Sequence, residues 1–121
     1  MATALSIDLL FEAAVKIQVM HERNIQLSFT EFGIYIKFPT TRRLAEFLDV
    51  PHYYVLPFFA VMEEEDLVTR VERVGIATTR KGTVRFLAML NERYREDAEK
   101  LLGPALLNDI LSSAQLPEKS P

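Results

Sequence analysis

Residues 39–59 read PTTRRLAEFLDVPHYYVLPFF, and their spacing predicts two short helices joined by a tight turn. Thr40 or Thr41 is a typical N-cap for the first helix, and Pro51 suits the first turn of the second. Asp49 occupies the turn, because Asp accepts a left-handed backbone better than most residues do. The side chains that we expect to face inward are Leu44, Ala45, Phe47 and Leu48 in the first helix and Val55 and Phe58 in the second.

The composition is that of one folded domain. At 121 residues, of which 49% are hydrophobic and 26% charged, the chain is long enough to bury one core and too hydrophobic to be disordered. It contains no cysteine, which excludes disulfides, thiolate metal sites and a cysteine nucleophile. No apolar run approaches the roughly 20 residues of a membrane span, and the N-terminus lacks the pattern of a signal peptide. We therefore expect a cytoplasmic protein with no membrane partner.

Residues 28–38, SFTEFGIYIKF, are compatible with two structures. Ser28, followed three residues later by Glu31, is a capping-box pattern that would begin a short helix. Alternation typical of a strand is also present, at Phe32, Ile34, Ile36 and Phe38. Because Pro39 follows at once and the next segment is helical, we expect a short helix with an extended end, although periodicity alone leaves helix or strand open.

Residues 61–90, VMEEEDLVTRVERVGIATTRKGTVRFLAML, continue the pattern beyond the second helix. They predict a strand around residues 67–73, a turn that contains Gly75, and a return strand around residues 76–78. Thr79 would then cap a long helix.

Over roughly residues 28–100 the chain resembles the winged helix-turn-helix regulators of the MarR and PadR type. The resemblance rests on the two helices in residues 41–58, the strand start in residues 67–70 and the Thr-x-Lys-Gly helix start in residues 79–82. It implies a mainly α fold with a small β-wing. It also implies a dimeric, DNA-binding transcription factor whose terminal helices pair and whose second motif helix enters the major groove.

We expect a single winged-helix domain over residues 1–115. Its parts would be an N-terminal dimerisation helix in residues 1–25, the helix-turn-helix and wing in residues 28–85, and C-terminal helices in residues 79–113, followed by a flexible tail in residues 116–121. Gly103 would end the long helix, and Pro104 would begin the last one.

The first helix, with Thr3 as a possible N-cap, is apolar around most of its circumference and therefore needs cover on most sides. A second copy of the chain would provide that cover, so we expect a homodimer. A central core helix in a monomer is the alternative.

The second motif helix is poorly equipped to read bases. Arg, Lys, Asn and Gln pair best with base edges, and none lies in residues 51–60. The cations lie beside this helix instead, because residues 68–85 carry five of them against one acidic residue. The DNA-binding residues that we predict are Thr41, Arg42, Arg43, His52, Tyr53, Arg70, Arg73, Arg80 and Lys81.

The Thr-x-Lys-Gly helix start has two possible roles. A phosphate could be held by the amides that follow Thr79 together with Lys81, because helix N-termini attract anions. Alternatively, this turn is a feature of the fold and its charges are solvated.

Two functions remain. The first is a DNA-binding protein, a transcriptional regulator or a DNA-organising protein, that contacts phosphates of double-stranded DNA through its wing with weak sequence discrimination. The second is a winged-helix interaction module, in which His52, Tyr53, Leu56 and Pro57 bind another protein.

His21 and His52 lie far apart, and no metal-binding His pattern or Gly-rich phosphate loop occurs, so we predict no enzyme activity, no metal and no cofactor.

Overall fold

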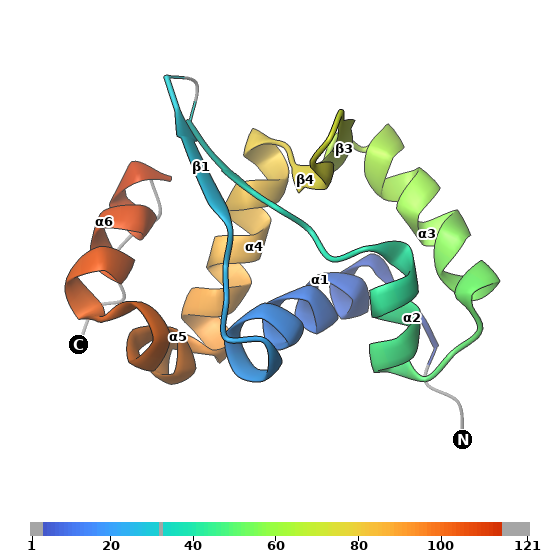
Figure 1. Cartoon of the computed structure of the whole chain (residues 1–121), viewed down its shortest axis with the longest axis horizontal. Coiled ribbons are helices and arrows are strands. Elements are labelled where there is room, and N and C mark those ends of the chain that lie inside the picture. The colour runs from blue at the N-terminus through green and yellow to red at the C-terminus, as the bar shows by residue number, and fades with distance from the viewer. Residues whose placement is uncertain (1–3, 32, 115–121) are drawn as a thin grey trace.

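The structure, a computed structural model, describes residues 4–31 and 33–114, which form a mostly helical fold with two small antiparallel hairpins (Figure 1). The helices are α1 (Ile7–Lys16), the π-helical turn η1 (Ile17–His21), α2 (Thr41–Leu48), α3 (His52–Glu64), α4 (Arg80–Arg93), α5 (Arg95–Leu102) and α6 (Pro104–Ser113). The hairpins pair β1 (Leu27–Thr30) with β2 (Gly33–Ile36), and β3 (Val68–Val71) with β4 (Gly75–Thr78). Helices α2 and α3 lie at one end of the molecule and α5 and α6 at the other, with α1 and α4 between them.

Helix α1 is the central helix of the core. Ser6 caps it by accepting a hydrogen bond from the Leu9 amide at 3.0 Å, whereas the expected cap, Thr3, lies outside the described residues. Helix α1 packs against α2 and α4, and η1 packs against α5. The buried residues of α1 and η1 are Leu10, Phe11, Ala13, Ala14, Val15, Ile17, Gln18 and Val19. The chain thus covers this helix by itself, which supports the core-helix interpretation and removes the apolar surface of α1 as an argument for a second copy.

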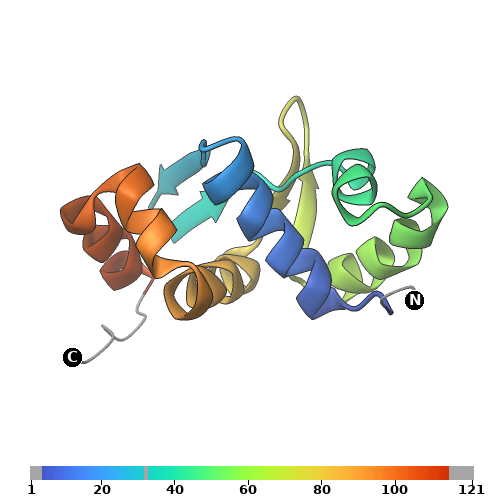
Figure 2. The same ribbon diagram turned by 90° about the horizontal axis from the view of Figure 1, so that it is seen from below.

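Residues 28–30 and 33–36 lie in the two strands of a hairpin, so the short helix that we expected there is wrong; Phe32 lies outside the described residues. A strand places alternate residues on opposite faces. Ile34 and Ile36 are accordingly buried, while Tyr35 between them is only partly covered. Gly33 supplies a φ of 134° at the turn, a conformation that other residues rarely adopt. The hairpin contacts α4 and α6 through β2 (Figure 2), and this burial of alternate residues outweighs the capping-box pattern.

Helices α2 and α3 form the predicted pair joined by a tight turn. Thr40 caps α2 by accepting a hydrogen bond from the Arg43 amide at 3.1 Å, and Asp49 has the expected left-handed backbone, with φ 55° and ψ 50°. Helix α3 begins at His52, one residue later than predicted, and continues through Pro57. Its buried residues are Val55, Phe59 and Met62, and Phe58, which was expected to face inward, is half-buried.

The β3–β4 hairpin follows α3, where two strands and a turn were predicted. It is attached to the segment after β2, because Lys37 forms a bridge with Ala77 and the Phe38 amide donates to the Ile76 carbonyl at 2.8 Å. Helix α4 begins directly after Thr79, its predicted cap.

Three hydrogen bonds between buried groups connect both hairpins to α4. The Ile36 amide donates to the Thr78 hydroxyl at 2.9 Å. The hydroxyls of Thr78 and Thr83 lie 2.7 Å apart, and the Thr83 hydroxyl donates to the Ile34 carbonyl at 2.7 Å. Thr78 and Thr83 are 0% and 2% exposed, so the Thr78 hydroxyl has its partners only when β2, β4 and α4 are all in place. The Thr83 hydroxyl also lies 2.9 Å from the Thr79 carbonyl, within the first turn of α4.

The long helix predicted after Thr79 is divided at Tyr94, where α4 ends and α5 begins. Helix α6 begins at Pro104, as predicted. The guanidinium of Arg95 links α4, α5 and α6 at this end of the molecule. Its hydrogen-bond partners are the side chains of Asn91, Glu99 and Asn108.

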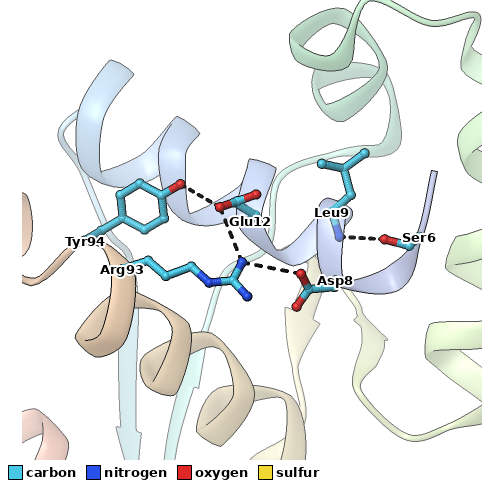
Figure 3. A network of polar contacts seen from close by, with 6 residues as sticks. All are labelled: Ser6, Asp8, Leu9, Glu12, Arg93 and Tyr94. Atoms are coloured by element: carbon cyan, nitrogen blue, oxygen red, sulfur yellow. Dashed lines mark hydrogen bonds and ion pairs between the residues drawn. The ribbon is translucent and has the colours of Figure 1, made fainter. Parts of the chain in front are cut away.

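A polar cluster attaches α1 to the junction between α4 and α5 (Figure 3). Arg93 Nη1 lies 3.4 Å from a carboxylate oxygen of Asp8 and from one of Glu12, and the Tyr94 hydroxyl donates to Glu12 at 2.8 Å. Partial burial, followed by the hydrogen bond to Glu12 and the charge of that carboxylate, raises the pKa of Tyr94 to about 12.

Replacing Thr83 with Val should lower the free energy of unfolding by about 2 kcal/mol, because Val keeps the shape but leaves the Thr78 hydroxyl and the Ile34 carbonyl without their partner. Urea unfolding followed by circular dichroism measures this loss. The control is Thr69→Val on β3, where the side chain is exposed and little change is expected. Equal losses in the two variants would show that the buried hydrogen bonds contribute little.

The folded protein should lose stability between pH 10 and about 12 as Tyr94 ionises. Because the pKa of Tyr94 is raised in the folded state, its contribution is fully present below the unfolded value of 10.0 and is lost as the pH rises through about 12. Urea midpoints across this range should fall more steeply for the natural chain than for Tyr94→Phe, which has no such proton to lose. Parallel curves for the two proteins would contradict the raised pKa.

Candidate nucleic-acid interface

Two predicted contact residues, Thr41 and His52, hold the turn between α2 and α3. The Thr41 hydroxyl and the Nε2 atom of His52 lie 2.7 Å apart, and both side chains are half-buried. This nitrogen of His52 is therefore already engaged within the fold. Tyr53, by contrast, is 65% exposed on the outer face of α3.

The two arginines at the start of α2 have different surroundings. Arg43 is half-buried and pairs with Glu22 at 3.4 Å. Arg42 is exposed and has no ion pair with any described residue, but it borders a cleft of about 370 Å³ together with Glu46 and Asp49. A phosphate at Arg42 would therefore also meet carboxylates, which makes this position a weak anion site.

The two arginines of the β3–β4 hairpin also differ. Arg70 pairs with Glu63 at 3.4 Å on the exposed surface, where salt readily screens such a pair. Arg73 lies in the turn between the strands, with a left-handed φ of 67°. It is exposed and has no ion pair within residues 4–31 and 33–114, so its guanidinium is available to an anion.

The Thr-x-Lys-Gly helix start has a structural role in the fold. Thr79 donates to the carbonyl of Asp66 and accepts from the amide of Gly82. Lys81 Nζ donates to the carbonyl of Glu65 at 3.1 Å, at the C-terminal end of α3, where the helix dipole favours a cation. Lys81 thus has a partner that the phosphate interpretation did not include.

Gly82 packs directly against the chain that leaves α3. A Cβ atom at this position would lie 1.8 Å from the carbonyl oxygen of Leu67, so a larger residue requires the backbone to move. The motif therefore docks α4 on the end of α3. Arg80, the variable residue of the motif, is exposed and has no ion pair in the described part of the chain.

A cation outside the predicted set, Lys37, shares a cleft with Arg73. The cleft has a volume of about 510 Å³, lies between the two hairpins, and includes no carboxylate among the residues that line it. Gln26, Ser28 and Tyr35 add side chains that can form hydrogen bonds. Lys37 is exposed and forms no ion pair with the described residues. Two cations without a carboxylate are the kind of surroundings that favour a phosphate group.

Lys37 also borders a second cleft, of about 390 Å³, which Arg43 and Gln18 line as well. Gln18 is 4% exposed and donates from Nε2 to the Lys37 carbonyl at 2.9 Å, which helps to position the lysine backbone. Glu22 is the acidic residue of this cleft, and Arg43 pairs with it. The two clefts, which we name the Lys37 clefts, connect Arg73 through Lys37 to Arg43.

The strand alternation in residues 28–38 is a sequence signal that Lys37 is exposed, but it can be used only if this segment is taken as a hairpin. With Ile34 and Ile36 facing inward on β2, the next residue follows on the outer face. The expectation of a short helix in this segment gave Lys37 no defined neighbours. Because Lys37 and Arg73 are far apart along the chain, nothing in the sequence indicated that the two residues line one cleft.

The Lys37 clefts are the main functional evidence that the geometry offers. Within the described ranges, no group of three or more His, Asp or Glu side chains is placed to hold a metal ion, and no helix is long and apolar enough to cross a membrane. The chain matches no family model, no curated protein and no solved structure.

Proposed function

We propose that this chain is a winged-helix DNA-binding protein that holds phosphates of double-stranded DNA in the Lys37 clefts. The order of elements supports a winged-helix fold. Helices α2 and α3 are joined by a tight turn, and the β3–β4 hairpin, which would be the wing, and α4 follow them. One observation carries the proposal. Lys37 and Arg73, neither of which forms an ion pair in the described part of the chain, line one cleft that has no carboxylate.

Such a site would contact the DNA backbone rather than the bases. Phosphate contacts release counterions, so the affinity should depend steeply on salt. Helix α3 contains no Lys, Arg, Asn or Gln that could pair with base edges. We therefore propose a DNA-organising protein, or a regulator with weak sequence discrimination, that acts in the cytoplasm. A homodimer would present two sets of clefts and bind more tightly through effective concentration.

Fluorescence anisotropy with a random-sequence DNA duplex across a salt series tests this function. Lys37→Ala/Arg73→Gly should weaken binding and reduce the salt slope by about 2, close to one unit for each lost phosphate contact. Glycine suits position 73 because it accepts the left-handed φ of 67°, so the fold should be preserved.

The control is Arg23→Gly/Lys100→Ala, which removes the same charge from two other exposed positions and again places glycine at a left-handed backbone, with φ 53° at Arg23. It should keep the natural salt slope if the Lys37 clefts hold the phosphates. Equal loss of slope in both double variants would mean that only net charge matters. Absence of binding by the natural chain at low salt would contradict DNA binding altogether.

A further inference from the structure

Helix α3 is apolar on two faces, and the fold covers only one of them. Val55, Phe59 and Met62 face the core and are at most 2% exposed. A second row of apolar residues, with the spacing i, i+3, i+4, i+7 and i+8 of a single helix face, points to solvent. This row, which we name the outer stripe, consists of Tyr53, Leu56, Pro57, Ala60 and Val61.

The outer stripe has the surface and the spacing of a helix-packing interface. Tyr53 is 65% exposed, Leu56 44% and Val61 41%. The ring of Tyr53 meets the ring of Tyr54 edge to face, with 4.8 Å between the centroids, which widens the apolar surface. Contiguous exposed apolar residues mark interaction sites, and rows at this spacing are those along which one helix packs on another.

Acidic residues lie near both ends of the outer stripe. No Lys or Arg stands in residues 44–69. The acidic residues that precede, end or follow α3 are Glu46, Asp49, Glu63, Glu64, Glu65 and Asp66. Within the part of the chain that the structure describes, only three cations contact or border these six acidic residues, namely Arg42, Arg70 and Lys81. A partner that covers the stripe should therefore carry positive charge beside its own apolar surface.

We infer that the outer stripe binds an amphipathic helix of a partner protein. The apolar face of that helix packs along α3, and its Lys or Arg side chains meet the acidic ends of the stripe. Tyr53 is exposed at the N-terminal end of the stripe, and tyrosine is a residue type that often carries binding energy at interfaces. The outer stripe contains none of the cations of the Lys37 clefts, so the inference does not depend on DNA binding.

Two other occupants fit the charges less well. A second copy of the chain, joined stripe to stripe by a twofold axis, would bring the acidic ends of both copies together. DNA would meet carboxylates at both ends of α3 and no cation between them.

A displayed pool of helical peptides tests the inference. Each peptide has leucines along one face and Lys, Glu or Ser at random in the positions beside them. Selection on the natural chain should enrich peptides that carry Lys beside the leucines. A labelled peptide from this selection should bind at least about tenfold more weakly to Leu56→Ser/Val61→Ser and to Glu64→Lys.

The matched control is Leu106→Ser on α6, because Leu106 and Leu56 are both 44% exposed. This control should bind the peptide as the natural chain does, and circular dichroism should show that all the variants are folded. DNA affinity should be the same for Leu56→Ser/Val61→Ser as for the natural chain, which separates this inference from the proposed DNA function.

Enrichment of peptides that lack Lys, or equal binding by the Leu56 and Leu106 variants, would overturn the inference. Analytical ultracentrifugation of the chain alone should give the same oligomeric state for the natural chain and for Leu56→Ser/Val61→Ser. A dimer that this double substitution dissociates would assign the outer stripe to a second copy. Loss of DNA binding in the same variant would assign it to DNA.

Discussion

The arrangement of the whole molecule depends on the buried hydrogen bonds that pass through Thr78 and Thr83. They join an amide and a carbonyl of β2 to a hydroxyl of β4 and a hydroxyl of α4, all out of contact with water. A buried polar group left without a partner costs about 1 to 3 kcal/mol, so the two hairpins and α4 are stable together and costly apart. Because β4 also bridges the chain at Lys37, the same bonds set the position of Lys37 relative to Arg73.

The fold presents two surfaces that differ in charge and polarity. The Lys37 clefts lie beside the hairpins and gather cations around polar side chains. The outer stripe of α3 is apolar and ends in carboxylates, so it repels the phosphates that the clefts would attract. In the winged-helix proposal, the helix that usually reads bases is then free for a protein partner. A small domain of this kind could hold DNA and a protein at the same time, because the two ligands require different chemistry from different elements.

Local signals predicted much of the fold. The caps Thr40 and Thr79, the left-handed turn at Asp49 and the start of α6 at Pro104 all lie where short-range chemistry places them. The same signals were wrong for residues 28–38, because a capping box and a strand alternation competed and only contact with α4 and α6 favours the strand. The candidate site was predicted less well, since the partners that occupy or expose each cation lie far away in the chain.

The sequence by itself determined where α2, α4 and α6 begin and where the chain turns at Asp49, because caps, prolines and turn residues act between positions a few residues apart. Only the tertiary structure decided what each face of those elements contacts. It covered the apolar first helix within one chain, turned Lys81 toward the end of α3, placed Lys37 in the same cleft as Arg73 and left the outer stripe uncovered. Burial and the pairing of charges depend on groups brought together by folding, and no local pattern contains that information.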